Sequence, residues 1–311
     1  MTLHAPETDT LPPPPGGLVL GVLDETDPAA VAAADHAARH WRWPDPGPLR
    51  PGTAVHRRAT AAMFRDTFNP YKPSIIAWPV LEPAARDRLV SLPIWDIAVQ
   101  TEGKARLRML AYAQALADLV GAYGIALAPE PPYLPPRDAE WAYLVTGFSE
   151  CIDSFFAFGL FELAKRSGYF PPALVDTFEP VIQEETRHIL LFANWLAAHR
   201  ATLSPLRRVW FELRVLAVWA FLGWERVGIA RGLDDGKKAP AQDNSFTLTG
   251  SQAVSDVDVS PAELMAICLE ENDRRFAGYD PRLRRPTTTP ALARLAIRVL
   301  GLLRRRAPRP A

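Results

Sequence analysis

The residues best suited to chemistry are Glu185 and His188, which stand three positions apart in a run that turns apolar from Ile189 to Phe192. Residues three apart lie on one face of an α-helix, so one carboxylate and one imidazole are expected to project together. Such a pair is half of the ligand set with which helical bundles hold metal ions. The next question is which other side chains complete the site.

A second pair of charged residues, Glu150 and Asp153, stands in an otherwise uncharged, aromatic-rich stretch from Leu144 to Phe161. A carboxylate buried in such a stretch is unfavourable unless it is paired or bound to a metal. A metal ion and an arginine are the two candidate partners. In the second case, Arg187 or Arg106 would hold the acids in a buried structural network. Both interpretations stay open at this point.

Glu102 is a third candidate carboxylate, because it falls inside a proline-free segment, 94–123, that carries apolar residues at helical spacing. In a bundle it would bring a further ligand to the centre. Equally, Glu102 would be a solvated residue that pairs with Lys104 or Arg106.

Four long helical segments are expected to position these residues: 94–123, 138–167, 172–199 and 205–231. Asp138 is a typical N-cap residue and Gly168 a typical helix end. Pro180 predicts a kink or break near Glu179 in the third segment. Short connections between long helices favour an antiparallel bundle, and almost no segment alternates with the period of a strand. The predicted fold class is therefore all-α.

The rest of the chain divides by composition. Residues 1–92 are predicted to form a Pro-rich N-terminal arm with short helices at about 27–41 and 53–68. The bundle would occupy 93–232 and a polar loop 233–260. Residues 261–311 are predicted to form C-terminal helices, at about 261–278 and 290–305, that pack on the bundle.

The composition excludes some classes of function. Lys+Arg and Asp+Glu are balanced at 35 each, so the basic footprint of a nucleic-acid-binding protein is absent. The two cysteines, Cys151 and Cys268, are expected to be reduced core residues, which is typical of a cytoplasmic protein. The longest apolar run, 215–224, is far shorter than the roughly 20 residues that span a bilayer. We therefore expect a soluble, cytoplasmic protein.

The run Glu185-Thr186-Arg187-His188, followed by apolar residues, resembles the last ligand-bearing helix of the ferritin-like superfamily. The closest resemblance is to the branch of the ribonucleotide reductase small subunit and related oxidases, and Glu150 is spaced like the ligand of their preceding helix. The resemblance covers residues 93–232. It implies a four-helix bundle with a non-haem di-metal site, usually iron, and oxygen chemistry or metal oxidation. The ligand pattern is incomplete, because that family uses two Glu-x-x-His motifs and this chain has one.

The prediction is thus a ferritin-like four-helix bundle with an N-terminal arm and extra C-terminal helices. The predicted metal ligands are Glu102, Glu150, Asp153, Glu185 and His188. Two iron ions, or manganese and iron, would be the cofactor. Phe148, Phe155 and Phe192 are expected to keep water out of the site.

The expected function is that of a non-haem di-metal oxidoreductase or oxygenase acting on a small, apolar substrate with O2. The alternative is a non-catalytic ferritin-like protein with a degenerate metal site, which acts as a structural or interaction protein. A homodimer is an expected assembly, and no nucleic-acid partner is expected. The basic, apolar helix 290–305 would pack on the core, contact a second copy, or lie on a membrane surface.

Overall fold

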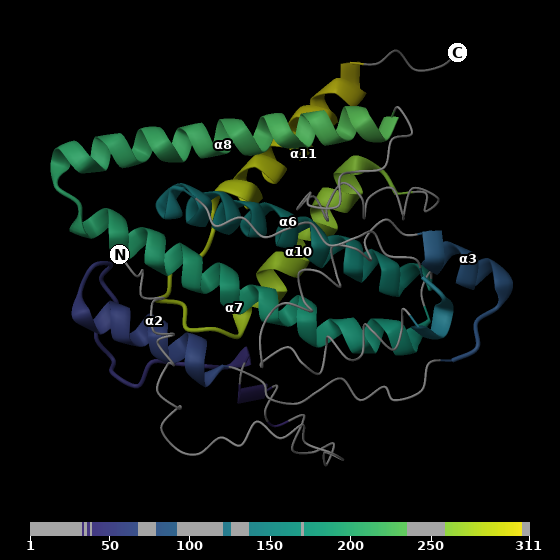
Figure 1. The fold of residues 1–311 in the computed structure, drawn as a ribbon, viewed down its shortest axis with the longest axis horizontal. Helices are drawn as coiled ribbons and strands as arrows, with labels where there is room; N and C mark the ends of the chain where they lie inside the picture. The colour runs from purple at the N-terminus through teal and green to yellow at the C-terminus, as the bar shows by residue number, and fades with distance from the viewer. Residues whose placement is uncertain are drawn as a thin grey trace, which may run out of the picture.

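The computed structural model describes residues 33, 36–37, 39–67, 79–91, 121–125, 137–168, 171–234 and 259–306. Within these ranges every regular element is a helix and no strand occurs, which confirms the predicted all-α class. The helices are α2 (Ala54–Asp66), α3 (Pro83–Ser91), α6 (Ala139–Ser167), α7 (Pro172–Thr202), α8 (Pro205–Asp234), α10 (Pro261–Ala277) and α11 (Thr288–Arg306) (Figure 1). The expected helix 94–123 lies outside the described residues except at its end.

Local sequence sets the ends of the long helices. Asp138 caps α6 by accepting a hydrogen bond from the Trp141 backbone N–H at 2.9 Å. Gly168 ends the same helix in the left-handed conformation, with φ at 63°. Ser260 and Glu263 form a reciprocal capping box at the start of α10. The predicted boundaries of these helices are therefore confirmed to within a residue or two.

α7 is one continuous α-helix from Pro172 to Thr202. It passes through Pro180, so the break that the sequence predicted near Glu179 does not occur. A proline inside a helix removes one backbone hydrogen bond and crowds the preceding turn. α7 packs against α2, α6 and α10, and this tertiary packing supplies most of the stability of such a helix.

α6 is the central helix of the described fold, because it contacts α7, α8, α10 and α11 (Figure 1). One hydrophobic cluster joins it to α7 and α8, and its most buried members include Leu144, Phe158, Ile189, Leu190, Val218 and Leu222. α6 is also the one described helix that is long and apolar enough to cross a membrane, from Ala139 to Arg166. However, 72% of its apolar window is buried inside the fold, as in the core helix of a folded domain.

Two glycines let α6 approach its neighbours closely. A Cβ atom at Gly147 would overlap the ring of Phe192 on α7, and one at Gly159 would overlap Cys268 on α10. Gly147 lies one helical turn before Glu150. Its contact with Phe192 therefore sets the separation of α6 and α7 beside the candidate metal ligands.

The N-terminal arm and the turn before α11 hold each other in place. The Trp43 backbone N–H donates to Asp280 at 3.0 Å, and the Arg282 guanidinium donates to the Trp43 carbonyl at 2.7 Å. Asn194 of α7 ties the same turn to the core, since its side-chain oxygen accepts from the Arg284 backbone N–H at 2.9 Å. The stretch around Trp43 is therefore tied to this turn, and α2 of the same predicted arm packs on α7.

Candidate metal centre

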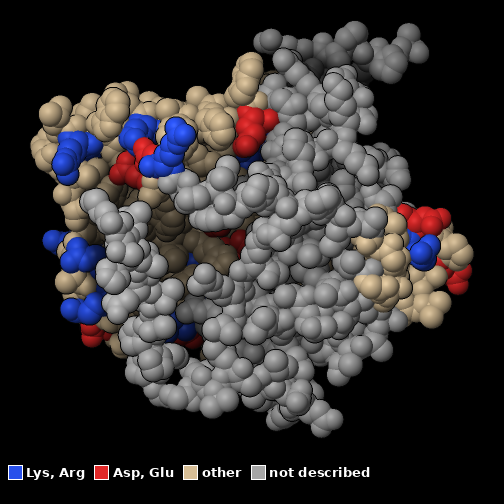
Figure 2. All heavy atoms as spheres, viewed as in Figure 1, with Lys and Arg blue, Asp and Glu red and all other residues tan. Residues whose placement is uncertain are grey.

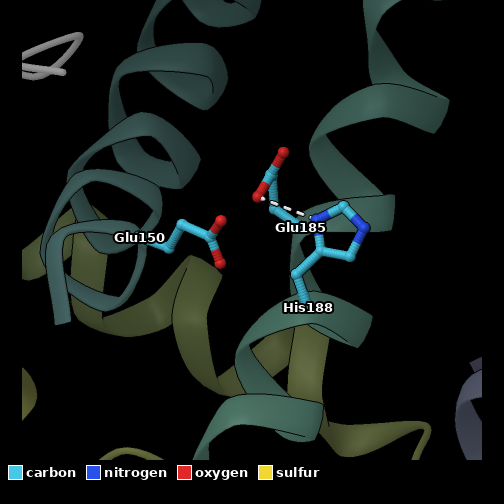
Figure 3. Close-up of side chains that lie close together, drawn as sticks. All are labelled: Glu150, Glu185 and His188. Carbon is cyan, nitrogen blue, oxygen red and sulfur yellow. Dashed lines mark ion pairs between the residues drawn. The ribbon is translucent and has the colours of Figure 1, made fainter. Parts of the chain in front are cut away.

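Three of the predicted ligands, Glu150, Glu185 and His188, converge between α6 and α7. One ligand atom from each side chain lies within 4.8 Å of the other two. Figure 3 shows the Glu150 carboxyl reaching from its helix toward Glu185 and His188 on the neighbouring one. Nδ1 of His188 lies 3.5 Å from Oε2 of Glu185. The Glu-x-x-His pair and the acid of the preceding helix are therefore brought together.

Helical spacing and aromatic packing explain this placement. Glu185 and His188 are one turn apart on α7, and 22% and 36% of their side chains are exposed. Phe148, two residues before Glu150, meets Phe192 edge to face with ring centroids 5.1 Å apart. Both rings are buried. The three grouped side chains thus lie beside the apolar core and are only partly exposed to solvent.

The phenylalanines expected to shield the site separate into two groups. Phe148 and Phe192 belong to the core cluster between α6 and α7. Phe155 instead packs against Cys268 of α10 and Ala293 of α11. Only the first two therefore belong to the cluster that packs between the helices carrying the three polar side chains.

The Glu150 carboxyl has an unusual protonation equilibrium. Burial, together with the negative charge of Glu185, raises its pKa to about 7. Asp153 adds to this increase and His188 opposes it. Burial and a neighbouring like charge both disfavour the ionised form of a carboxyl group. Glu150 is therefore poised to exchange a proton near neutral pH, which is uncommon for glutamate and typical of functional sites.

His188 has the complementary shift. Burial alone would lower its pKa, but the hydrogen bond and charge of Glu185, with the charge of Glu150, outweigh burial and raise the pKa above its usual value. The protonation of the His188 imidazole is therefore coupled to that of Glu150. A divalent cation would displace those protons, because metal ligands bind in their deprotonated forms.

The three donors fit a divalent transition metal. Carboxylate oxygens and an imidazole nitrogen bind such ions at about 2.0–2.2 Å, so two ligands of one ion lie up to roughly 4.4 Å apart. Atoms that are already within 4.8 Å of one another need only small side-chain rotations to reach that geometry. Two carboxylates and one imidazole suit manganese, iron or zinc and leave other coordination positions open.

Asp153, a fourth predicted ligand, faces a different partner. Arg226 of α8 donates to both of its carboxylate oxygens, at 2.9 and 2.8 Å, and the Ser149 hydroxyl donates to one of them at 2.8 Å. Asp153 is therefore not one of the three grouped side chains. The sequence correctly offered an arginine as an alternative partner, but the arginine seen here is Arg226 and not Arg187, and Arg106 lies outside the described residues.

Arg187 points away from the acids of α6. Its guanidinium is buried, donates to Thr67 Oγ1 at 2.9 Å and to the Phe64 carbonyl, and pairs with Glu184. It also lies over the Phe64 ring, 4.5 Å from the centroid. The same ring is 6.0 Å from the His188 ring. Arg187 thus fastens α7 to α2 and places an aromatic side chain beside His188, a role that sequence reasoning missed.

Glu102, the remaining predicted ligand, lies outside the described residues.

Comparisons of the chain with protein-family models, with curated proteins and with solved structures found no match. The case for a function accordingly rests on the chemistry of this chain and on the geometry of its three grouped side chains.

Proposed function

We propose that this protein binds a divalent transition metal through Glu150, Glu185 and His188 and acts as a ferritin-like non-haem metal oxidoreductase. The observation that carries the proposal is the convergence of two carboxylates and an imidazole, from two helices, within 4.8 Å. Two neighbouring carboxylates repel each other, and a cation between them relieves that repulsion. Arg187, which lies between Glu185 and His188 in the sequence, points to another face of α7 and is engaged with α2 instead.

The resemblance to the ferritin-like superfamily extends the proposal to a four-helix bundle with two metal ions. In that arrangement the segment 94–123 is the remaining bundle helix, and Glu102 contributes a further carboxylate. Support comes from the all-helical fold and from the spacing of Glu150 and the Glu185–His188 pair. Iron or manganese would supply the redox chemistry with O2 that amino-acid side chains lack.

The chain's own groups would bind, exclude water and handle protons. Glu150 holds a proton near neutral pH and would release it when a cation arrives. Phe64, Phe148 and Phe192 give the surroundings an apolar character that suits a small, apolar substrate. The location of the substrate would be the exposed side of His188 and Glu185.

The test is metal content. The protein would be purified without metal, loaded with Fe(II) or Mn(II) under anaerobic conditions, and analysed by elemental mass spectrometry. We expect a stoichiometric ion that is lost in Glu185→Ala and His188→Ala. A stoichiometry of two ions would support the di-metal form, and one ion the mononuclear form.

The fold offers a matched control pair on the same two helices. Glu140 of α6 and His199 of α7 also form a carboxylate–imidazole contact, at 3.3 Å, but without a third ligand. Glu140→Ala and His199→Ala should therefore leave metal binding unchanged. Equal metal content in all four variants, or none in the wild type, would refute the proposal.

The second candidate is a helical interaction protein with a degenerate site. The ion pair of Asp153 with Arg226 favours it, because this pair shows that a buried acid of α6 is neutralised by protein alone. On that reading Glu150 stays protonated and binds nothing. This candidate would be supported over the first if the protein took up no metal after incubation with Fe(II) or Mn(II) and kept the same oligomeric state.

A further inference from the structure

α8 has a second apolar face that points away from the core. Its buried side chains, Phe211, Val215, Val218 and Leu222, pack inward. On the opposite side, seven large apolar residues are exposed: Leu206 by 83%, Val209 by 61%, Trp210 by 64%, Leu213 by 53%, Leu216 by 64%, Phe221 by 42% and Trp224 by 76%. A helix that is apolar on both faces is normally covered on both.

Four of these seven residues, together with the exposed Ala217 and Ala220, follow the spacing of a helix–helix seam. Residues 206, 210, 213, 217, 220 and 224 are separated alternately by four and three positions, which is the period of a coiled-coil stripe. This stripe contains no charged residue. The charged residues of the same segment, such as Arg207, Glu212 and Glu225, lie along its borders by helical periodicity. Burial of the stripe would therefore cost no desolvation of charge.

The stripe is large enough for a stable interface. The exposed parts of Trp210 and Trp224 alone amount to on the order of 300 Å². Leu206 and Leu213 of the stripe, with Val209, Leu216 and Phe221 on its flanks, raise the apolar surface toward the ~800 Å² that each partner contributes to a typical interface. Monomeric proteins seldom leave a continuous apolar patch of this size in water. In Figure 2 the band along which α8 runs in Figure 1 is tan at its outer edge, and basic and acidic groups gather beneath that edge.

We propose that the stripe on α8 binds the α8 helix of a second copy of this chain in an antiparallel pair. The sizes of the side chains set the register, with the two-fold axis near position 215. Leu206 then faces the partner's Trp224, Trp210 faces the partner's Ala220, and Leu213 faces the partner's Ala217. Large residues meet small ones in the centre, which allows two helices to pack closely. A parallel pair would stack Trp210 on the partner's Trp210.

Charge at the border agrees with the antiparallel direction. Arg207 and Glu225 lie on the same border of the stripe, near opposite ends of the helix. The Arg207 side chain is exposed, and that of Glu225 is 31% exposed. In an antiparallel pair Arg207 comes next to the partner's Glu225, and the reverse contact repeats across the axis. In a parallel pair this border would face the opposite border of the partner, so Arg207 and the partner's Glu225 would not meet.

The first test is the mass of the full-length protein in solution. Sedimentation velocity at micromolar concentrations should give a dimer for the wild type. Leu213→Glu should raise the dimer Kd by roughly 100-fold or more, because two carboxylates would be buried in the seam. Leu295→Glu is the matched control, since Leu295 on α11 is 55% exposed. It should leave the dimer intact. Circular dichroism confirms that both variants remain helical.

The second test reads the register. A mixture of Leu213→Cys and Ala217→Cys proteins should form a disulfide-linked heterodimer, whereas a mixture of Leu206→Cys and Ala217→Cys should not. The native Cys151 and Cys268 are buried and give little background.

A wild type that stays monomeric would overturn the proposal. If that monomer sedimented with phosphatidylcholine–phosphatidylglycerol vesicles, the stripe would belong to a lipid surface. Neither result depends on metal content, so failure here and failure of the proposed function are distinguishable.

Discussion

Arg226 of α8 donates hydrogen bonds to both carboxylate oxygens of Asp153 on α6, and the Ser149 hydroxyl donates to one of them. The carboxyl of Glu150, one turn earlier on the same helix, has instead Glu185 and His188 as neighbours. Two acids that look equivalent in the sequence therefore have different environments. One is neutralised by a fixed guanidinium, and the other remains available to a cation.

Removal of the Arg226 guanidinium should destabilise the fold. Arg226→Met leaves Asp153 with an uncompensated charge, and only 12% of its side chain is exposed. We expect the free energy of unfolding to fall by about 3 kcal/mol, measured by urea denaturation. Arg166→Met, which removes the surface pair with Glu162, should have a much smaller effect, because water screens that pair. If both variants lost the same small amount of unfolding free energy, the Arg226–Asp153 pair would not fasten α8 to α6.

The metal-free protein should lose stability as the pH rises toward neutrality. The pKa of Glu150 is about 7 in the folded chain and 4.5 in the reference state, so the folded state binds the proton more tightly. This contribution is fully present below about pH 4.5 and is lost as the pH passes 7, with a total on the order of 3 kcal/mol. The raised pKa of His188 acts in the same direction. The measurement is thermal unfolding in the presence of chelator at several pH values, for the wild type and for Glu150→Gln. The same pH dependence of stability in both proteins would contradict the prediction.

Metal affinity should have the opposite pH dependence. A bound cation requires ionised Glu150 and neutral His188, and both hold protons to a higher pH than usual. Below about pH 7 the affinity should rise about tenfold or more per pH unit, and proton release should accompany binding. Calorimetry in two buffers of different ionisation enthalpy measures that release. Glu150→Gln should bind more weakly and release fewer protons, while a flat profile for the wild type would argue against Glu150 as a ligand.

Alanine substitutions at two helical glycines should have opposite effects. Gly147→Ala places a methyl group where the Phe192 ring lies, so we expect a loss of about 1–3 kcal/mol and weaker metal binding as α6 and α7 separate. Gly301→Ala in α11 meets no atom within 4 Å and should stabilise the protein by about 0.5–1 kcal/mol. Chemical denaturation compares the two. A gain in stability at both positions would mean that Gly147 does not set the helix separation.

The sequence predicted the convergence of Glu150, Glu185 and His188 for two physical reasons. Positions three apart share a helix face, and an isolated acid in an apolar helix needs a partner nearby. Both rules are local, and they predicted the helix boundaries equally well. They do not say how far one helix lies from another.

Local spacing could not predict which residues Arg226 and Arg187 contact. Arg226 reaches Asp153 across 73 positions, and Arg187 reaches Thr67 across 120. Such contacts depend on how α8 and α2 cross the other helices, which side-chain spacing within one segment does not specify. Of the kink or break predicted at Pro180, the break does not occur, for a related reason: α7 continues through the proline while it packs against its neighbours.

The contact of Trp43 with Asp280 joins positions 237 apart, whereas the three grouped ligands come from two successive helices. Local contacts form fast and distant ones slowly, because a long loop must first be closed. During synthesis, when domains fold as they emerge, α6 and α7 leave the ribosome well before the turn that holds Asp280. The pair α6 and α7, which carries the three ligands, would therefore assemble before the N-terminal arm can contact the turn at Asp280. We therefore expect closure of the arm to follow assembly of these two helices.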